Sequence, residues 1–110
     1  MLSMSLYHPD PGQLQLPDVL QALSDPHRLQ IVRRLAETDE PCNCGAFDLG
    51  VTKSTLTHHF RVLREAGVIR QQQLGTSKLN SLRRADLDGR FPGLLDAVLA
   101  ASQPPVPNGV

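Results

Sequence analysis

The sequence has few cysteines, no long hydrophobic run and no net charge. Only two of its 110 residues are cysteines, too few for a disulfide framework, and a single residue separates them. No apolar stretch approaches the roughly 18–20 residues that a helix needs to span a bilayer. The first residues lack the positive region and apolar stretch of a signal peptide. These absences predict a single globular domain in the reducing cytoplasm.

Charge is balanced over the whole chain but not along it. Eleven Lys and Arg residues accompany eleven Asp and Glu residues. Residues 53–84 hold seven of the basic residues and one acidic residue, a local charge of +6. The remainder of the chain is correspondingly at −6. A basic third of this kind is typical of a surface that binds a polyanion.

The chain divides into two polar ends and one patterned domain. Residues 1–13 and 102–110 are rich in proline and polar residues, and we expect them to be flexible tails. Residues 14–101 are expected to fold. A helix is predicted to begin at Asp25-Pro26, because aspartate caps free N–H groups and proline suits the first turn. A shorter apolar stripe predicts a helix just before it, formed by Leu16, Val19, Leu20 and Leu23.

The middle of the chain has the signals of a helix-turn-helix followed by a hairpin. Thr52 is a suitable cap for a helix that runs to about Ala66, and Gly67 is its stop. A helix of at most two turns is expected before it, within residues 44–49. Two runs, 68–74 and 78–82, flank a Gly-Thr-Ser tip and indicate a β-hairpin. The expected fold class is mainly α with a small β-hairpin wing, a winged helix-turn-helix.

The predicted helix over residues 53–66 has one apolar and one polar face. At about 100° per residue, Leu56, Phe60 and Leu63 share a side. The opposite side and the hairpin have short hydroxyls, an imidazole and cations, which suit base edges and phosphates. We expect double-stranded DNA to bind here, although an ordinary solvated helix face is the alternative. The predicted contacts are Lys53, Ser54, Thr57, His58, Arg61, Arg64, Arg70 and Lys78, with Arg83 and Arg84 also near the hairpin tip.

The two adjacent histidines of this helix are expected to differ. His58 lies on the polar side and can reach DNA. His59 falls among Leu56, Phe60 and Leu63, so we expect it to be partly buried and hydrogen-bonded to backbone. Consecutive side chains on a helix diverge by about 100°, so this pair is poorly placed to chelate one ion.

The last predicted helix has a wide apolar face. Phe91, Leu94, Leu95, Val98 and Leu99 recur at helical spacing on one side. A face this apolar does not remain in water alone, and we expect it to pack against a second subunit.

Two stretches carry a family resemblance: residues 23–29 read LSDPHRL, and residues 53–69 read KSTLTHHFRVLREAGVI. Both strongly resemble the ArsR/SmtB family of winged-helix transcriptional repressors, and the likeness covers about residues 16–101. It implies a homodimer, paired through its first and last helices, that leaves its operator when an inducer binds. Arg28, in the Asp-Pro-x-Arg signature, is expected to have a structural role. The DNA-contact positions carried over are Ser54, Thr55, Thr57, His58 and Arg61, and the implied dimer interface is Val19, Leu20, Leu23, Leu94, Leu95, Val98 and Leu99.

Cys42-Asn43-Cys44 looks like the Cys-x-Cys of metal-sensing members of that family. Thiolates bind thiophilic ions, so Cys42 and Cys44 are candidate ligands of a regulatory transition-metal ion. The segment that follows is about one residue shorter than the usual pattern, and the chain has no third cysteine. One alternative is that Cys44 packs as a small apolar residue while Cys42 is an incidental exposed thiol. A redox role of the two thiols is the other. No other cofactor is expected.

A winged helix can serve as a protein-interaction module without touching DNA. The basic segment favours DNA, and neutralising Arg61 and Lys78 distinguishes the two hypotheses. An enzyme is not expected, because no Ser-His-Asp order, phosphate loop or zinc-hydrolase spacing is found.

Overall fold

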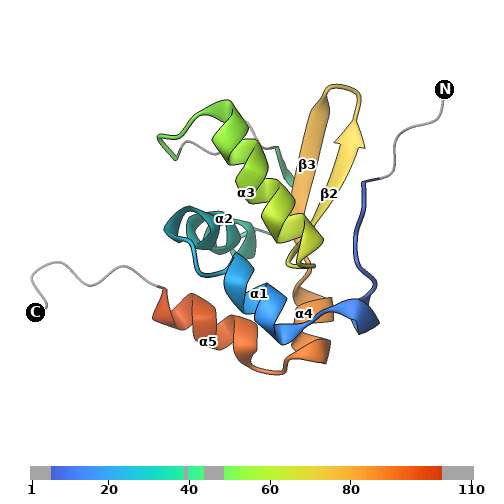
Figure 1. Cartoon of the computed structure of the whole chain (residues 1–110), viewed down its shortest axis with the longest axis vertical. Coiled ribbons are helices and arrows are strands. Elements are labelled where there is room, and N and C mark those ends of the chain that lie inside the picture. Colours follow the sequence, from blue (N-terminus) through green and yellow to red (C-terminus); the bar gives the residue numbers. More distant parts are fainter. Residues whose placement is uncertain (1–5, 39, 44–48, 103–110) are drawn as a thin grey trace, which may run out of the picture.

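The structure, a computed structural model, describes residues 6–38, 40–43 and 49–102. In chain order the elements are a 3-10 turn (Pro11–Gln13), α1 (Leu16–Ala22), α2 (Pro26–Ala36), β1 (Cys42–Asn43), α3 (Lys53–Glu65), β2 (Ile69–Leu74), β3 (Ser77–Leu82), α4 (Arg84–Arg90) and α5 (Leu94–Ala101). The strands form one antiparallel sheet in the order β1-β3-β2. Figure 1 shows α3 beside the β2–β3 hairpin, which we call the wing, and α5 at the opposite end of the molecule.

The predicted fold class, a mainly α winged helix-turn-helix, is confirmed. The Asp25 carboxylate caps α2 by accepting hydrogen bonds from the backbone N–H groups of His27 and Arg28. The Thr52 hydroxyl caps α3 by accepting from the N–H of Thr55. Gly67 ends α3 with a φ of 87°, and Leu14 occupies the space that a β-carbon would need there. Glycine is therefore required at this turn.

Besides the 3-10 turn, two elements were not predicted. Helix α4 buries only Leu87, so its sequence shows almost no helical periodicity. Strand β1 has two residues and pairs with β3, with Cys42 opposite Asn80. The short helix expected within residues 44–49 lies almost entirely outside the described residues.

The core lies between the helices and the base of the wing. It is built almost entirely from aliphatic side chains, together with one phenylalanine. In the described ranges, no helix has both the length and the apolar character needed to cross a membrane. The buried apolar residues are Leu14, Val19, Ala22, Leu23, Ile31, Val32, Leu35, Phe60, Leu63, Val68, Ile69, Leu87 and Leu95.

Residues 6–13, which we expected in a flexible tail, lie against the domain. Three arginines donate hydrogen bonds to backbone carbonyls of the segment before α1. The pairs are Arg64 Nε to Tyr7 O (3.1 Å), Arg83 Nη1 to Pro9 O (2.8 Å) and Arg90 Nε to Leu14 O (3.0 Å). The segment is thus fixed to α3, to the end of β3 and to α4.

Candidate nucleic-acid interface

Helix α3 presents a continuous polar face to solvent. Its inner side is buried through Phe60 and Leu63, as the apolar periodicity predicted. Its outer side combines hydroxyls, one imidazole and two cations, the groups that hydrogen-bond to base edges and phosphates. Six of the predicted DNA contacts are exposed on this helix: Lys53, Ser54, Thr55, Thr57, His58 and Arg61.

Arg64, also predicted to contact DNA, does not lie on this face. Its side chain is buried, and its Nη1 donates to Gln71 Oε1 at 2.7 Å while its Nε donates to Tyr7 O. Helical periodicity placed Arg64 with the polar residues, but the N-terminal segment covers it. The guanidinium is therefore a structural group, which corrects the prediction.

The wing keeps two of its predicted contacts available. Arg70 on β2 is exposed, and Lys78 on β3 is half-buried. Two other cations assigned to this region are bound within the protein. Arg83 is buried and pairs with Asp86 at 2.9 Å, and Arg84 pairs with Asp96 at 2.9 Å. The basic segment is consequently less available to DNA than its charge of +6 suggested.

A chain of buried polar side chains joins α3 to all three strands. Arg64 donates to Gln71 Oε1, and Gln71 Nε2 donates to Asn80 Oδ1 at 2.7 Å. Asn80 Nδ2 then donates to the carbonyl of Cys42 on β1 at 3.0 Å. We call this series the amide chain. It sets the position of the wing relative to α3.

His8 fastens the N-terminal segment to the wing. Its Nε2 accepts from the backbone N–H of Gln71 at 2.9 Å, and its Nδ1 lies 2.9 Å from Leu6 O. These contacts require a neutral ring with its proton on Nδ1. Burial lowers the pKa of His8; the bond to Leu6 O opposes this, and the charges of Arg70, Arg64 and Arg83 reinforce it.

The lowered pKa of His8 predicts a stability that falls on acidification. An unfolded histidine has a pKa near 6.5, so the His8 contribution is complete above that pH. Below it, the unfolded state binds the proton more readily, and the contribution is lost as the pH falls toward the folded pKa. We expect urea unfolding to show a smaller pH-dependent loss between about pH 8 and pH 5.5 in His8→Gln than in the wild type. Equal losses in the two proteins would contradict this role of His8.

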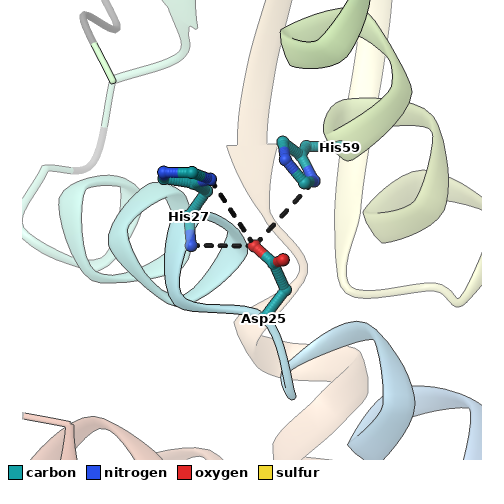
Figure 2. A group of neighbouring side chains, drawn as sticks. All are labelled: Asp25, His27 and His59. Carbon is teal, nitrogen blue, oxygen red and sulfur yellow. Dashed lines mark hydrogen bonds and ion pairs between the residues drawn. The ribbon is translucent and has the colours of Figure 1, made fainter. Parts of the chain in front are cut away.

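Asp25, His27 and His59 converge where the start of α2 meets α3, as Figure 2 shows. His59 is buried, but its partners are side chains and not the backbone that we predicted. Its Nδ1 lies 3.2 Å from Arg28 Nη1 and 4.0 Å from Asp25 Oδ1. Arg28 also donates to Ala22 O at 2.7 Å, which confirms its predicted structural role.

The electrostatics of this cluster favour an ionised aspartate and neutral His59. Burial lowers the pKa of His59; the Asp25 carboxylate opposes this, and Arg28 reinforces it. Burial raises the pKa of Asp25, but the backbone N–H groups of Arg28 and His27 outweigh it and leave the pKa below its usual value. The sequence shows both motifs but not their proximity, since Asp25 and His59 are 34 positions apart.

The predicted dimer residues fall into two groups. Val19, Leu23 and Leu95 are buried in the core of the single chain, so their assignment to an interface is corrected. Leu20 remains 45% exposed on α1, beside Leu16 at 42%. On α5, half-buried side chains remain at Leu94, Val98 and Leu99.

The candidate metal site at the cysteines is described only in part. Cys42 is half-buried on β1, and its Sγ lies 3.7 Å from Glu40 O. Cys44 lies outside the described residues.

Comparisons with known proteins agree on one class of relatives. A family model described as a helix-turn-helix domain matches residues 23–72. An uncharacterized HTH-type transcriptional regulator of Bacillus subtilis, YceK, is 33% identical over 82 residues, which are 73% of this chain and 82% of that protein. The arsenical resistance operon repressor of B. subtilis is 30% identical over 70 residues, 63% of this chain and 67% of that protein.

Solved structures show the same fold. The transcriptional repressor BigR from Xylella fastidiosa aligns with a TM-score of 0.61 and 25% identity, over 78% of this chain and 84% of that one. An ArsR family transcriptional regulator aligns with a TM-score of 0.59 and 24% identity, over 80% of this chain and 91% of that one.

Proposed function

Because the chain belongs to the ArsR/SmtB family of winged helix-turn-helix transcriptional regulators, we propose that it places the exposed face of α3 in the major groove of operator DNA. The observation that carries this proposal is the polar face itself. Small hydroxyls at Ser54 and Thr57 let the helix backbone approach base edges closely. Arg61, farther along the helix, then lies within reach of the phosphates.

The wing extends this surface beside α3. Arg70 and Lys78 lie on its two strands, and exposed Gln72 and Gln73 accompany them on β2. The amide chain holds this hairpin against α3, so both elements meet the duplex as one body. We assign Arg70 and Lys78 to the phosphate backbone beside the groove.

A homodimer is the second part of the proposal. Leu16 and Leu20 leave an apolar surface on α1, and Leu94, Val98 and Leu99 are incompletely covered on α5. Side chains of this kind are buried when two copies pair about a twofold axis. Two copies of α3 then meet two half-sites of a symmetric operator. Since two of the relatives are named repressors, we place this chain in the repressor class, with release by an inducer.

Two groups of substitutions are expected to affect DNA binding differently. Arg61→Ala and Lys78→Ala each leave one phosphate per subunit without its cation, so each weakens binding to every sequence and reduces the salt slope by about 1 per subunit, or about 2 for the bound dimer. Ser54→Ala, Thr57→Ala and His58→Ala remove hydrogen bonds to bases, so each reduces discrimination between operator and random duplex by about 1–3 kcal/mol. Fluorescence anisotropy over a salt titration, with upstream and scrambled duplexes, measures both effects.

Glu37→Gln is a suitable control, because Glu37 is exposed at the end of α2 and removing its charge does not touch α3. The assignment of the faces fails if the two groups of variants behave alike. The DNA-binding proposal itself fails if the wild type shows no sequence selectivity at any salt concentration.

A metal-responsive form of this regulator is the second candidate. One observation favours it: the carbonyl of Cys42 is the end of the amide chain that begins at Arg64 on α3. A soft ion bound to the thiolates of Cys42 and Cys44 is therefore linked through the hydrogen bonds of the amide chain to α3, the proposed DNA-binding helix. Arsenite or Cu(I) is then expected to release DNA from the wild type and not from Cys42→Ser. Release from both proteins would contradict the cysteine site.

A further inference from the structure

The side chains of Asp25, His27 and His59 offer three ligand atoms that all lie within 4.8 Å of one another. The Nδ1 atoms of His27 and His59 are each 4.0 Å from the same oxygen, Asp25 Oδ1. Figure 2 shows the two rings on either side of that carboxylate, one from the first turn of α2 and one from α3. Two imidazoles and a carboxylate from two helices therefore point to a common space.

We propose that Asp25, His27 and His59 form a binding site for a divalent transition ion, with Zn²⁺ as the representative. Imidazole nitrogen and carboxylate oxygen are established Zn²⁺ donors, and three protein ligands leave a fourth position for water. Ligand atoms of a tetrahedral Zn²⁺ site are about 3.4 Å apart, given bonds of about 2.1 Å. The two 4.0 Å distances need to shorten by about 0.6 Å, and any other separation, which is at most 4.8 Å, by at most about 1.4 Å. His27 is half-exposed, so its ring can rotate to close the site.

The ionisation states of the cluster suit metal binding. A ligand must be neutral imidazole or ionised carboxylate, and the environment stabilises those forms of His59 and Asp25. Asp25 can keep its cap on α2 while it binds an ion, because an ionised carboxylate has about four lone-pair positions. The half-exposed side of His27 is the entry path.

Arg28 competes with the metal ion for the ring nitrogen of His59. Its Nη1 is 3.2 Å from His59 Nδ1, the atom that the ion needs. An incoming ion has to break this hydrogen bond, whereas the bond from Arg28 Nε to Ala22 O at the end of α1 can persist. Occupancy therefore replaces an Arg28–His59 contact with a metal bridge between α2 and α3.

The metal bridge between α2 and α3 does not depend on the proposed function, because the site can bind an ion without DNA. Any effect of the ion on operator affinity does rest on that function. The test is accordingly made without DNA, on the full chain, so that failure of the DNA-binding proposal leaves its result intact.

The experiment begins with C42S/C44S protein, in which the thiolates no longer bind metal. Zn²⁺ is titrated in competition with a chromogenic chelator, and Co²⁺ is added separately to record its visible ligand-field spectrum. We expect one Zn²⁺ per chain and a Co²⁺ spectrum of a nitrogen and oxygen site without sulfur charge transfer. In the same background, His27→Gln is expected to lower Zn²⁺ affinity by at least about tenfold.

His58→Gln is the matched control, since it removes the neighbouring imidazole of α3, which is exposed and outside the cluster. Its Zn²⁺ affinity is expected to stay within about twofold of the C42S/C44S parent. Asp25→Asn keeps an oxygen to cap α2 but loses the charge, and it is expected to weaken Zn²⁺ as His27→Gln does. Circular dichroism checks that each variant is folded. The proposal is overturned if the parent binds no Zn²⁺, or if His27→Gln and His58→Gln have the same affinity.

Discussion

Arg64→Met is expected to destabilise the domain by about 2–4 kcal/mol, although Arg64 belongs to a helix that faces DNA. Arg64 is 9% exposed, and its guanidinium donates to Gln71 Oε1 and to Tyr7 O. Methionine keeps much of the apolar stem but provides no donor. Gln71 Oε1 then loses this donor at a buried position and Tyr7 O loses it at a part-buried one, at a cost of about 1–3 kcal/mol each. Urea unfolding followed by circular dichroism measures the loss.

Arg61→Met is the matched control for this experiment. It makes the same substitution three residues earlier on α3, at an exposed position. Its unfolding free energy is expected to change by less than about 0.5 kcal/mol, while its DNA affinity falls. If Arg64→Met proves as stable as the wild type and loses only DNA affinity, Arg64 is a phosphate contact after all and the structural assignment is wrong.

Leu20→Glu is expected to give a folded monomer with DNA affinity reduced by about 100-fold or more. The substitution places a charge on α1 at a side chain that is 45% exposed in the single chain and proposed to be covered in the dimer. Burying an unpaired carboxylate opposes pairing. A monomer binds only one half-site, so it lacks the avidity of two linked DNA-binding surfaces. Sedimentation velocity and anisotropy measure the two effects.

Gln30→Glu adds the same charge at an exposed position of α2 and controls for the change in net charge. Val98→Glu tests the α5 half of the surface and is expected to resemble Leu20→Glu. Leu95→Glu differs from both, because Leu95 is buried in the core and the variant is expected to unfold. A Leu20→Glu monomer with undiminished DNA affinity, or a Leu20→Glu dimer, would contradict the proposed interface.

Local sequence signals were sufficient to predict α2, α3 and the wing. The caps at Asp25 and Thr52, the apolar stripe of each helix and the glycine that ends α3 are all local to one helix, so they can be identified without any tertiary information. The same periodicity also predicted which polar residues of α3 are exposed, apart from Arg64. Helix α4 was missed because it turns only Leu87 toward the core.

Long-range contacts explain the errors at the candidate site. Periodicity places Arg64 on the polar side of α3, but it does not reveal that its guanidinium donates to the carbonyl of Tyr7, 57 residues earlier, and is buried there. The same limit applies to Leu95: a pattern shows that a helix face is apolar, and only the tertiary structure shows whether its own chain or a partner covers it. Asp25 and His59 were both singled out by their motifs, yet their proximity arises from the packing of α2 on α3.

The amide chain can exist with only one orientation of its groups. An arginine can only donate at one end, and a carbonyl can only accept at the other, so both amides between them are forced to point the same way. If the Asn80 amide were reversed, its Oδ1 would face the Cys42 carbonyl oxygen and its Nδ2 would face Gln71 Nε2. A carboxylate introduced at position 71 would force this reversal. The unfavourable contact would then lie between two acceptors, Asn80 Oδ1 and the Cys42 carbonyl of β1. It would be two residues along the amide chain from position 71, where the sequence was changed.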